Sequence, residues 1–161
     1  MKFCKVRNVK SPERGTSKAA GIDFFVPSGN ITVVPPHCDI LIPSGIKMEI
    51  PEGYMLMAAD KSGVVTSGPA CIAAGRVPKK EAFDSPVMLG AKIIDEDYQG
   101  EIHIHLINTG NNSIAIKPGM KIAQFILVPV SYEGLEEVTE TELFSRSSER
   151  GEGALGSTGS F

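Results

Sequence analysis

The sequence predicts an all-β domain of the barrel or sandwich type, followed by a flexible C-terminal arm. Short apolar or alternating runs of strand length fill the chain from Cys4 to Val130. Proline and glycine separate these runs, for example at 27–29 and 43–45, and both residues favour turns. No stretch before Glu133 carries the sustained i, i+3, i+4, i+7 spacing of an amphipathic helix. Evenly spaced short strands with few helices are typical of barrels and sandwiches.

Two segments interrupt the succession of expected strands. Residues 67–87 are rich in small residues, proline and lysine, and residues from 133 onward combine glutamates and serines with a glycine-rich end. Such segments offer little apolar surface to offset the entropy of ordering. We therefore expect a β-domain over residues 1–132, with a loop insertion at 69–85, and an arm over 133–161. The expected strands are GIDFFV (21–26), NITVV (30–34), CDILI (38–42), IKMEI (46–50), YMLMA (54–58), EIHIHLI (101–107), SIAI (113–116) and IAQFILVPV (122–130).

Composition excludes several classes of partner. Of the 161 residues, 42% are hydrophobic and 22% charged, as in a globular protein. The net charge of -3 gives no field that would attract a nucleic acid polymer. The apolar runs are far shorter than the roughly 20 residues of a membrane-spanning helix. Cys4, Cys38 and Cys71 form no CxxC pair, and the N-terminus resembles no secretory signal. We expect a cytoplasmic protein, in the host cytoplasm if the chain is viral.

Two short segments carry polar groups whose roles the sequence alone leaves open. AGIDF (20–24) places Asp23 at the start of a strand, where a turn residue or a solvated charge is the ordinary explanation. KSG (61–63) follows an apolar strand and offers a cation, a hydroxyl and backbone N–H groups to an anion. An ordinary polar hairpin turn is the alternative for this second segment.

Three further segments complete the pattern. IIDEDYQGE (93–101) belongs to a hairpin-like stretch that can present backbone groups to a base, a tyrosine face to a sugar and a carboxylate to water. KIAQF (121–125) places Gln124 between apolar neighbours, where its amide needs partners of a functional or structural kind. RGEGALGSTG (150–159) lets backbone N–H groups approach phosphate. A disordered chain end is the alternative for this last segment.

Taken in this order, the five segments resemble the five motifs of the trimeric dUTPase family. The resemblance covers residues 20–159, and IIDEDYQGE and RGEGALGSTG are its most specific parts. It implies a jelly-roll domain of the dUTPase-like β-clip type, which forms a homotrimer with shared active sites. It also implies an enzyme that hydrolyses dUTP to dUMP and pyrophosphate, through attack of water on the α-phosphorus.

The resemblance implies catalytic roles for three residues. Asp95 matches the carboxylate that orients and deprotonates the attacking water. Gln124 matches a glutamine near the phosphates and this water. The expected cofactor is Mg²⁺, bound mainly through triphosphate oxygens and water. Asp23 matches an outer-shell helper of this ion, so no direct protein ligand is expected.

The resemblance also implies which groups bind the substrate. Tyr98 matches the tyrosine that packs on the deoxyribose and leaves no room for a 2′-hydroxyl. Backbone groups of Lys92, Ile93 and Ile94 are expected to read uracil. The remaining contacts are expected from Lys61, Ser62 and Gly63, and from Arg150, Leu155, Gly156, Ser157 and Thr158 in the tail of a neighbouring subunit.

Three features depart from the usual family pattern. Lys61 stands where arginine is common, so a point charge replaces a bidentate fork. Leu155 stands where an aromatic residue usually stacks over uracil, so the lid keeps its apolar surface without the π face. The segment 69–85 is longer than in most members, and a solvated loop is the simplest expectation for it. A contact with a protein partner through this segment is a hypothesis without support in the sequence.

Alternatives remain open from the sequence. A dCTP deaminase, alone or bifunctional, would share the fold and the trimer, although the tail argues against it. A regulatory protein that binds dUTP and a protein partner is the alternative from another class. His103 and His105 alternate and therefore share one strand face. Without a third ligand nearby, we expect them to line a sheet face or a subunit interface and not to bind a metal.

Overall fold

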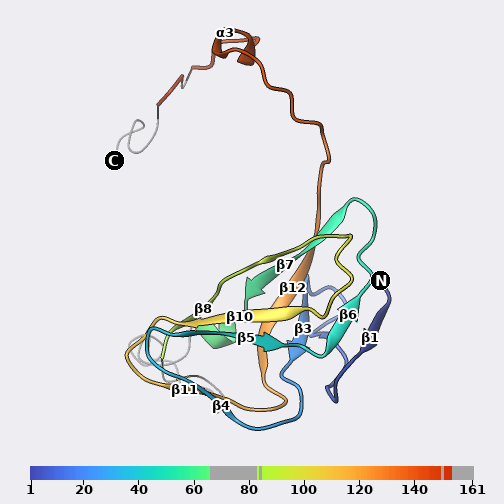
Figure 1. Cartoon of the computed structure of the whole chain (residues 1–161), viewed down its shortest axis with the longest axis vertical. Helices are drawn as coiled ribbons and strands as arrows, with labels where there is room; N and C mark the ends of the chain where they lie inside the picture. Colours follow the sequence, from blue (N-terminus) through green and yellow to red (C-terminus); the bar gives the residue numbers. More distant parts are fainter. Residues whose placement is uncertain (66–82, 84, 150, 154–161) are drawn as a thin grey trace. The chain divides into compact units, whose positions relative to one another are not determined.

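Strands dominate the computed structural model of the chain, which describes residues 1–65, 83, 85–149 and 151–153 (Figure 1). The chain divides into two units, Met1–Ser131 and Tyr132–Phe161. The second unit contains the one-turn helix α3 (Glu140–Leu143). The first contains the one-turn helix α1 (Ser62–Val65) and strands β1 (Phe3–Lys5), β2 (Glu13–Arg14), β3 (Gly21–Phe25), β4 (Thr32–Val34), β5 (Asp39–Pro43), β6 (Ile46–Met48), β7 (Tyr54–Asp60), β8 (Val87–Leu89), β9 (Ile93–Ile94), β10 (His103–Asn108), β11 (Ile114–Ile116) and β12 (Lys121–Pro129).

The all-β prediction is confirmed, because every segment expected to be a strand contains one. Helices in the described part of the chain are single turns, as the missing helical periodicity predicts. The sequence pattern missed β1, β2, β8 and β9. These strands are only two or three residues long, which is too short for an alternation to be visible.

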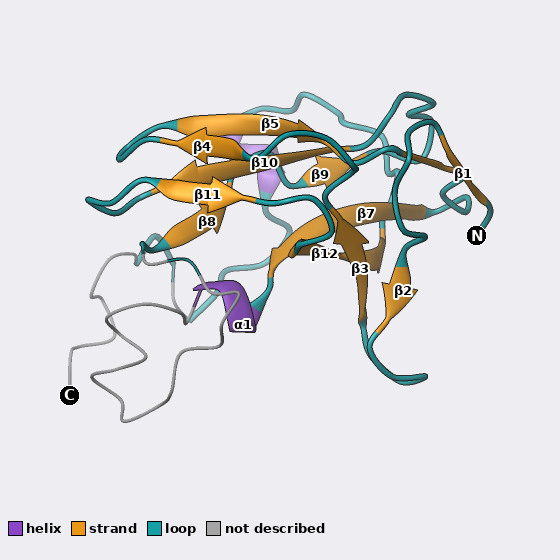
Figure 2. Cartoon of the chain, turned by 90° about the horizontal axis from the view of Figure 1, so that it is seen from below, coloured by secondary structure: helices purple, strands orange, loops and turns teal. Residues whose placement is uncertain are grey.

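The strands of the first unit form two layers (Figure 2). One layer is a five-stranded sheet in the order β2-β3-β12-β7-β9. The other contains the three-stranded sheet β5-β10-β8 and the pair β11-β4, while β1 pairs with β6. The described pairs are antiparallel. Antiparallel sheets packed face to face bury the alternate side chains that point inward. This alternation decides which residues of each strand lie in the core and which face outward.

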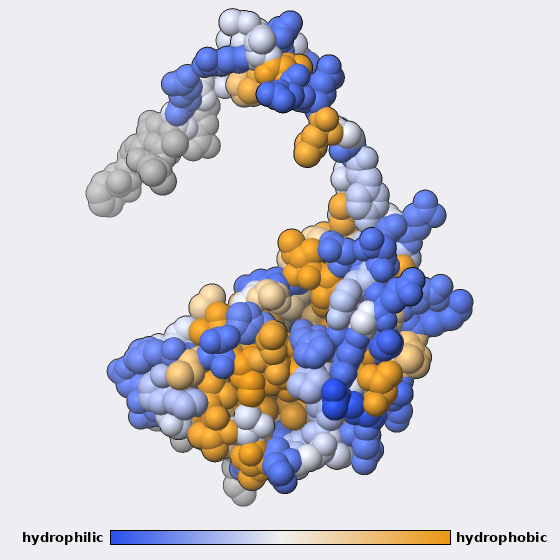
Figure 3. All heavy atoms as spheres, viewed as in Figure 1, coloured by the Kyte–Doolittle hydropathy of each residue, from blue (hydrophilic) through white to orange (hydrophobic). Residues whose placement is uncertain are grey.

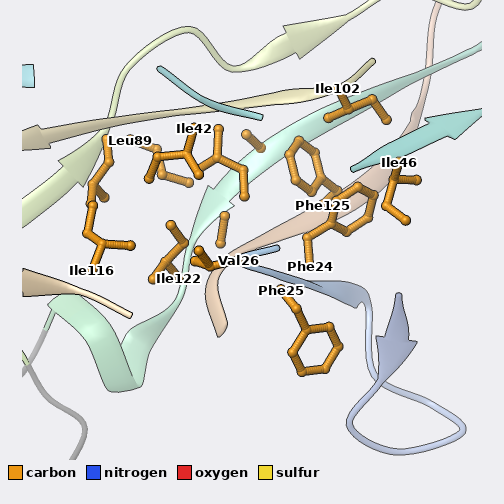
Figure 4. Close-up of a cluster of buried hydrophobic side chains, with 14 of the residues drawn as sticks. Phe24, Phe25, Val26, Ile42, Ile46, Leu89, Ile102, Ile116, Ile122 and Phe125 are labelled. Atoms are coloured by element: carbon orange, nitrogen blue, oxygen red, sulfur yellow. The ribbon is translucent and has the colours of Figure 1, made fainter. Parts of the chain in front are cut away.

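The core lies between the two layers (Figure 4). Its centre is the pair Phe24 and Phe125, from neighbouring strands β3 and β12, with ring centroids 4.4 Å apart. On β10, Ile104 and Leu106 point into the core while the intervening residues face outward. Figure 4 shows Phe25 on the opposite side of β3 from Phe24, as strand alternation requires.

The hairpin expected around 89–101 is wider than the sequence suggests. β8 and β10 do pair, with Leu89 opposite Leu106. Between them, however, β9 leaves this layer and pairs with β7 of the other sheet, with Ile94 opposite Leu56. The segment therefore crosses from one layer to the other and back.

The expected loop over 67–87 is too long at its C-terminal end. Val87 is the first residue of β8, and Phe83 and Ser85 are buried. The Ser85 hydroxyl donates to Asn108 Oδ1 at 3.0 Å, which anchors this end of the predicted insertion in the core. The rest of it, residues 69–82 and 84, lies outside the described residues. No helix in the described ranges is long and apolar enough to cross a membrane.

An ion pair fastens the N-terminal segment to the loop that carries IIDEDYQGE. Arg7 Nε and Nη2 donate to the two carboxylate oxygens of Glu101, at 2.7 and 3.0 Å. The Gly45 N–H also donates to Glu101, at 2.7 Å. The hydrogen bond from Arg7, with that from Gly45, lowers the pKa of the Glu101 carboxyl. Glu101 therefore joins three segments that are distant in the sequence.

Replacing Phe125 by alanine should lower the free energy of unfolding by about 3–5 kcal/mol, the usual cost of truncating a buried phenylalanine. Phe125 has no exposed surface. Urea denaturation at fixed protein concentration measures the effect, since association changes apparent stability. Ile31→Ala is the control, because Ile31 is exposed and such substitutions usually stay within about 0.5 kcal/mol. Equal losses in the two variants would contradict this core.

Glu101→Gln should reduce stability at neutral pH and lose its effect in acid. Because the folded pKa of Glu101 is lowered, its contribution is present above the unfolded pKa of about 4.3 and disappears as the pH falls through the folded value. Urea midpoints of both proteins at about pH 7 and at several values below about pH 4 test this expectation. A difference between the midpoints that stays constant with pH would refute it.

Candidate functional site

The buried carboxylate of Asp23 is the centre of a charged cluster on the five-stranded sheet. Asp23 is only 4% exposed, and strand register places it between Glu13 of β2 and Gln124 of β12. Its Oδ1 lies 2.7 Å from Lys61 Nζ, and its Oδ2 lies 3.3 Å from Lys121 Nζ. A buried carboxylate needs such partners. The interpretation of Asp23 as a turn residue or solvated charge is therefore wrong.

The charged cluster extends to the edge of the sheet. Lys121 Nζ also lies 2.9 Å from Glu13, whose other oxygen is 2.8 Å from Lys10 Nζ. The hydrogen bond to Glu13, with a further one to Asp23, raises the pKa of the Lys121 ammonium. Hydrogen bonds from Lys10 and Lys121 lower the pKa of Glu13. We call Lys10, Glu13, Asp23, Lys61 and Lys121 the Asp23 cluster; it holds three lysines and two carboxylates.

Gln124 has the structural partner that its place in a strand requires. Its Nε2 donates to the backbone oxygen of Asp60 at 3.1 Å. On the other side, the side chain lies so close to Gly21 that a Cβ at position 21 would overlap Gln124 Oε1. The glycine of AGIDF and the glutamine of KIAQF therefore depend on each other across the β3–β12 pair.

The segment 61–63 forms the start of α1 and not a hairpin turn. The N–H groups of Val64 and Val65 donate to the Lys61 carbonyl, at 2.8 and 3.1 Å. Ser62 and Gly63 are exposed, and a Cβ added to Gly63 would meet nothing within 4 Å. Packing among the described residues thus does not require glycine at position 63, and the missing side chain leaves the backbone accessible to a ligand on that side.

A pocket of about 200 Å³ lies at the other group of expected residues. Asp95, Tyr98, Ile93 and Ile94, which the sequence predicts as site residues, all line it. A groove of about 450 Å³ beside β1 and β6 shares Tyr98 but not Asp95; its greater size does not make it the better candidate, because the expected carboxylate is elsewhere. The full lining of the smaller pocket, the Asp95 pocket, is Leu41, Ala91, Ile93, Ile94, Asp95, Tyr98, Ile102, His103 and His105.

Asp95 is presented to solvent by a tight turn. The Tyr98 N–H donates to the Asp95 carbonyl at 3.2 Å, and the Tyr98 hydroxyl donates to the Glu101 carbonyl at 2.9 Å. Asp95 is exposed, and within the described ranges no side chain or backbone group bonds its carboxylate. A carboxylate held by its backbone and free at its oxygens can accept a proton from water.

β9 offers backbone groups beside this carboxylate. It is the last strand of the five-stranded sheet, so only one of its edges is paired among the described strands. The carbonyl of Lys92 is already used, because it accepts the Ala58 N–H at 2.7 Å. Lys92 Nζ lies 3.5 Å from Asp60 Oδ2, and Lys92 does not line the Asp95 pocket. Because Lys92 and Ala58 form a hydrogen-bonded pair, the alternation of an antiparallel ladder turns the backbone groups of Ile94 toward Leu56 and those of Ile93 outward. The unpaired edge at Ile93 therefore presents an N–H and a C=O group to a partner.

The Asp95 pocket and the Asp23 cluster lie at opposite ends of β7. Ile94 pairs with Leu56, so Asp95 continues toward the start of β7, whereas Lys61 follows its last residue. The five residue steps from Leu56 to Lys61 correspond to about 17 Å at roughly 3.3–3.4 Å per residue. One chain therefore does not bring its Asp95 to its own Asp23 cluster.

His103 and His105 share the outward face of β10, as the sequence predicts. His105 Nε2 lies 2.9 Å from Asp39 Oδ2, and His103 Nδ1 lies 2.8 Å from the Glu101 carbonyl. No group of three or more metal-binding side chains exists within the residues that the structure describes.

The sequence prediction missed Glu13, Asp39 and Asp60, and it assigned no role to Lys121. No local sequence motif marks Glu13 or Asp39, because their partners Lys121 and His105 are distant in the sequence. Lys121 belongs to KIAQF. The strand register is irregular between Lys121 and Ala123, so simple alternation along β12 does not predict which way Lys121 faces. The predicted residues Arg150, Leu155, Gly156, Ser157 and Thr158 lie outside the described residues.

Comparison with known proteins connects this arrangement to one family. The sequence profile of the dUTPase family matches residues 64–159. The deoxyuridine 5′-triphosphate nucleotidohydrolase of Chlamydia trachomatis serovar L2 is 32% identical over 158 residues, covering 98% of this chain and 97% of the relative. That of Rhizobium rhizogenes is 33% identical over 156 residues, covering 95% and 87%.

Solved structures agree with the sequence comparison. The dUTPase of Staphylococcus bacteriophage 80alpha, solved with dUPNHPP, is 25% identical and superimposes with a TM-score of 0.78. The match covers 98% of this chain and 97% of the phage enzyme. The expected jelly-roll β fold is confirmed by this likeness. The protein therefore belongs to the dUTPase family.

Proposed function

We propose that this chain hydrolyses dUTP to dUMP and pyrophosphate. The observation that carries the proposal is the Asp95 pocket, where a carboxylate that no described residue bonds, a tyrosine and the open edge of β9 line one cavity. Relatives that cover almost the whole chain are deoxyuridine 5′-triphosphate nucleotidohydrolases. Hydrolysis of dUTP would use the Asp95 carboxylate to activate water, the edge of β9 to bind the base and Tyr98 to contact the sugar.

Asp95 acts as the general base. Its exposed carboxylate orients a water molecule and accepts its proton as the oxygen attacks the α-phosphorus. The new P–O bond forms on dUMP, and the bond to the bridging oxygen breaks, so that pyrophosphate leaves. Tyr98 fixes the turn that presents Asp95, through the bond from its amide to the Asp95 carbonyl.

The base and the sugar are recognised by shape and by backbone groups. The outward backbone groups of Ile93, next to Ile94 in the pocket, supply a fixed donor and acceptor for uracil, and a base with a different pattern leaves them unpaired. The Tyr98 ring, held by its hydroxyl at the Glu101 carbonyl, packs on the deoxyribose and excludes a 2′-hydroxyl. Lys92 contributes through the backbone, because its carbonyl anchors β9 to β7.

The Asp23 cluster and the start of α1 form the phosphate side of the reaction. Three lysines face two carboxylates there, so the cluster is locally positive although the chain has a net charge of -3. Lys61 exchanges Asp23 for a phosphate oxygen, Ser62 and the open backbone at Gly63 donate to phosphate, and Gln124 lies beside them on β12. Because position 61 is lysine where arginine is common in the family, a single ammonium contacts the phosphate in place of a two-pronged guanidinium.

Mg²⁺ is the proposed cofactor, and it accompanies the triphosphate. Both oxygens of Asp23 are engaged by lysines, and the described residues contain no ready protein cage. This donor set fits an ion held mainly by phosphate oxygens and water. When bound, the ion neutralises charge on the phosphates. Asp23, partly released by Lys61, can then accept a hydrogen bond from a nearby water.

We propose a homotrimer in which neighbouring chains complete each active site. One Asp95 pocket, at about 200 Å³, is smaller than the roughly 300–1,000 Å³ of most small-molecule sites. The proposed phosphate-binding residues of the same chain lie at the far end of β7. Figure 3 shows apolar side chains exposed on the face where β5, β8 and β10 lie, and Leu41, Met88 and Ile93 are among the exposed apolar residues. Association would cover such surface.

The tail completes the proposed site. By family resemblance, Arg150, Gly156, Ser157 and Thr158 clamp the terminal phosphates of a neighbouring site, and Leu155 closes over the base. Residues 1–132, with the insertion 69–85, are the proposed catalytic β-domain, and residues 133–161 are the proposed arm that carries this lid. We also propose a cytoplasmic location, where nucleotides are found and free thiols such as Cys4 and Cys38 stay reduced.

A pyrophosphate-release assay tests the proposed function with dUTP, dCTP, dTTP and UTP as substrates. We expect turnover of dUTP only, because the other three differ at the base or the 2′ position. Replacing Asp95 by asparagine should lower kcat at least about 100-fold, within the range of general-base effects, and leave dUTP binding almost unchanged.

Asp97→Asn is the matched control for this substitution. Asp97 is an exposed carboxylate of the same loop that does not line the pocket, so its loss should leave turnover unaffected. Full activity of Asp95→Asn would refute the role of Asp95. Ammonia released from dCTP, with no pyrophosphate from dUTP, would refute the proposed function.

A further inference from the structure

His105 lies against the segment that joins β8 to β9. Its Nδ1 accepts the Ala91 N–H at 3.0 Å, and its Nε2 lies 2.9 Å from Asp39 Oδ2. Its backbone carbonyl accepts the Gly90 N–H at 2.9 Å. A backbone N–H only donates and a carboxylate only accepts. The His105 ring is therefore neutral in this arrangement, with its proton on Nε2.

The contact between ring and backbone is close. A Cβ at Gly90 would overlap the imidazole of His105, so glycine at this position permits the approach. The segment held in this way lies two residues before β9, and Ala91, Ile93 and His105 all line the Asp95 pocket. The position of the ring thus determines where the chain enters the edge that faces the pocket.

We propose that His105 is a positioning residue for the base-reading edge of β9, with Asp39 orienting its ring. The inference rests on the proposed function, in which the edge at Ile93 and Ile94 contacts uracil. Asp39 holds the proton on Nε2, and this leaves Nδ1 as the acceptor that fixes the Ala91 amide. His105 does not touch the phosphates, so its effect should appear in substrate binding more than in the chemical step.

Binding of dUTP should depend on the acceptor at Nδ1. Without this acceptor, the Ala91 N–H loses its partner on the His105 ring, and the segment before β9 is no longer fixed at that point. KM should therefore rise when a substitution removes the acceptor, and it should stay low when a substitution keeps one.

The test compares KM and kcat for dUTP in the wild type and in two variants of His105. His105→Val removes the acceptor, and KM should be about five- to tenfold higher, the equivalent of one hydrogen bond, with a smaller change in kcat. His105→Asn keeps an acceptor close to the position of Nδ1, so its KM should stay close to that of the wild type.

His37→Asn is the matched control, because His37 is bonded to Asn111 away from the pocket and its positive φ of 57° suits asparagine. KM should be unchanged in this variant. A KM in His105→Asn as high as that of His105→Val, or an unchanged KM in His105→Val, would overturn the proposal.

Nuclear magnetic resonance gives a readout that does not depend on turnover. Imidazole ¹⁵N shifts should report an Nε2–H tautomer for His105, and exchange of the Ala91 amide should be faster in His105→Val than in His105→Asn. An Nδ1–H tautomer would overturn the proposal even in an active enzyme. If dUTP is not hydrolysed, the proposed function fails, and these two measurements still decide whether His105 fixes the segment.

Discussion

The pairing of β12 with β3 on one side and with β7 on the other is the constraint on which the rest of the structure depends. It brings Phe24 and Phe125 together at the centre of the core. The same register places Gln124 between Asp23 and Ala59. Core packing and the polar groups around Asp23 thus arise from one set of strand contacts, with alternate residues facing the core and the polar groups.

Burial of Asp23 dictates the charges around it. A carboxylate that is almost fully removed from water is costly unless it is paired. Lys61 and Lys121 supply the pairing from the end of β7 and the start of β12. These lysines also make the surroundings locally positive in a chain of net charge -3. The groups that stabilise the buried acid are therefore the groups that a polyphosphate would attract.

The fold and the residues of the site differ in how well the sequence predicts them. Alternation and turn residues predicted the strands, because both express local rules. The motif around Asp95 and Tyr98 predicts that these two residues lie together, and they do, because they belong to one turn. The crossing of β9 to the other sheet was missed, because two residues carry no periodicity.

Contacts between distant segments account for the other differences. The ion pairs of Asp23 and the bond between Asp39 and His105 join residues far apart in the sequence, so no local pattern announces them. The same holds for Gly21 and Gly90, whose missing side chains are explained only by Gln124 and His105. Sequence spacing thus predicts strands, whereas the positions of these polar groups follow from how the strands pair.

The Asp95 pocket and the Asp23 cluster are separated along β7, so each active site needs both groups from different chains. Subunit complementation tests this central claim most directly. Asp95→Asn and Lys61→Ala chains, each impaired alone, would be unfolded together and refolded in equal amounts. If neighbouring copies share each site, random mixing unites an intact Asp95 with an intact Lys61 in about a quarter of the sites, and pyrophosphate release should recover to about that fraction of the wild-type rate. A mixture no more active than the average of its two components would contradict the account.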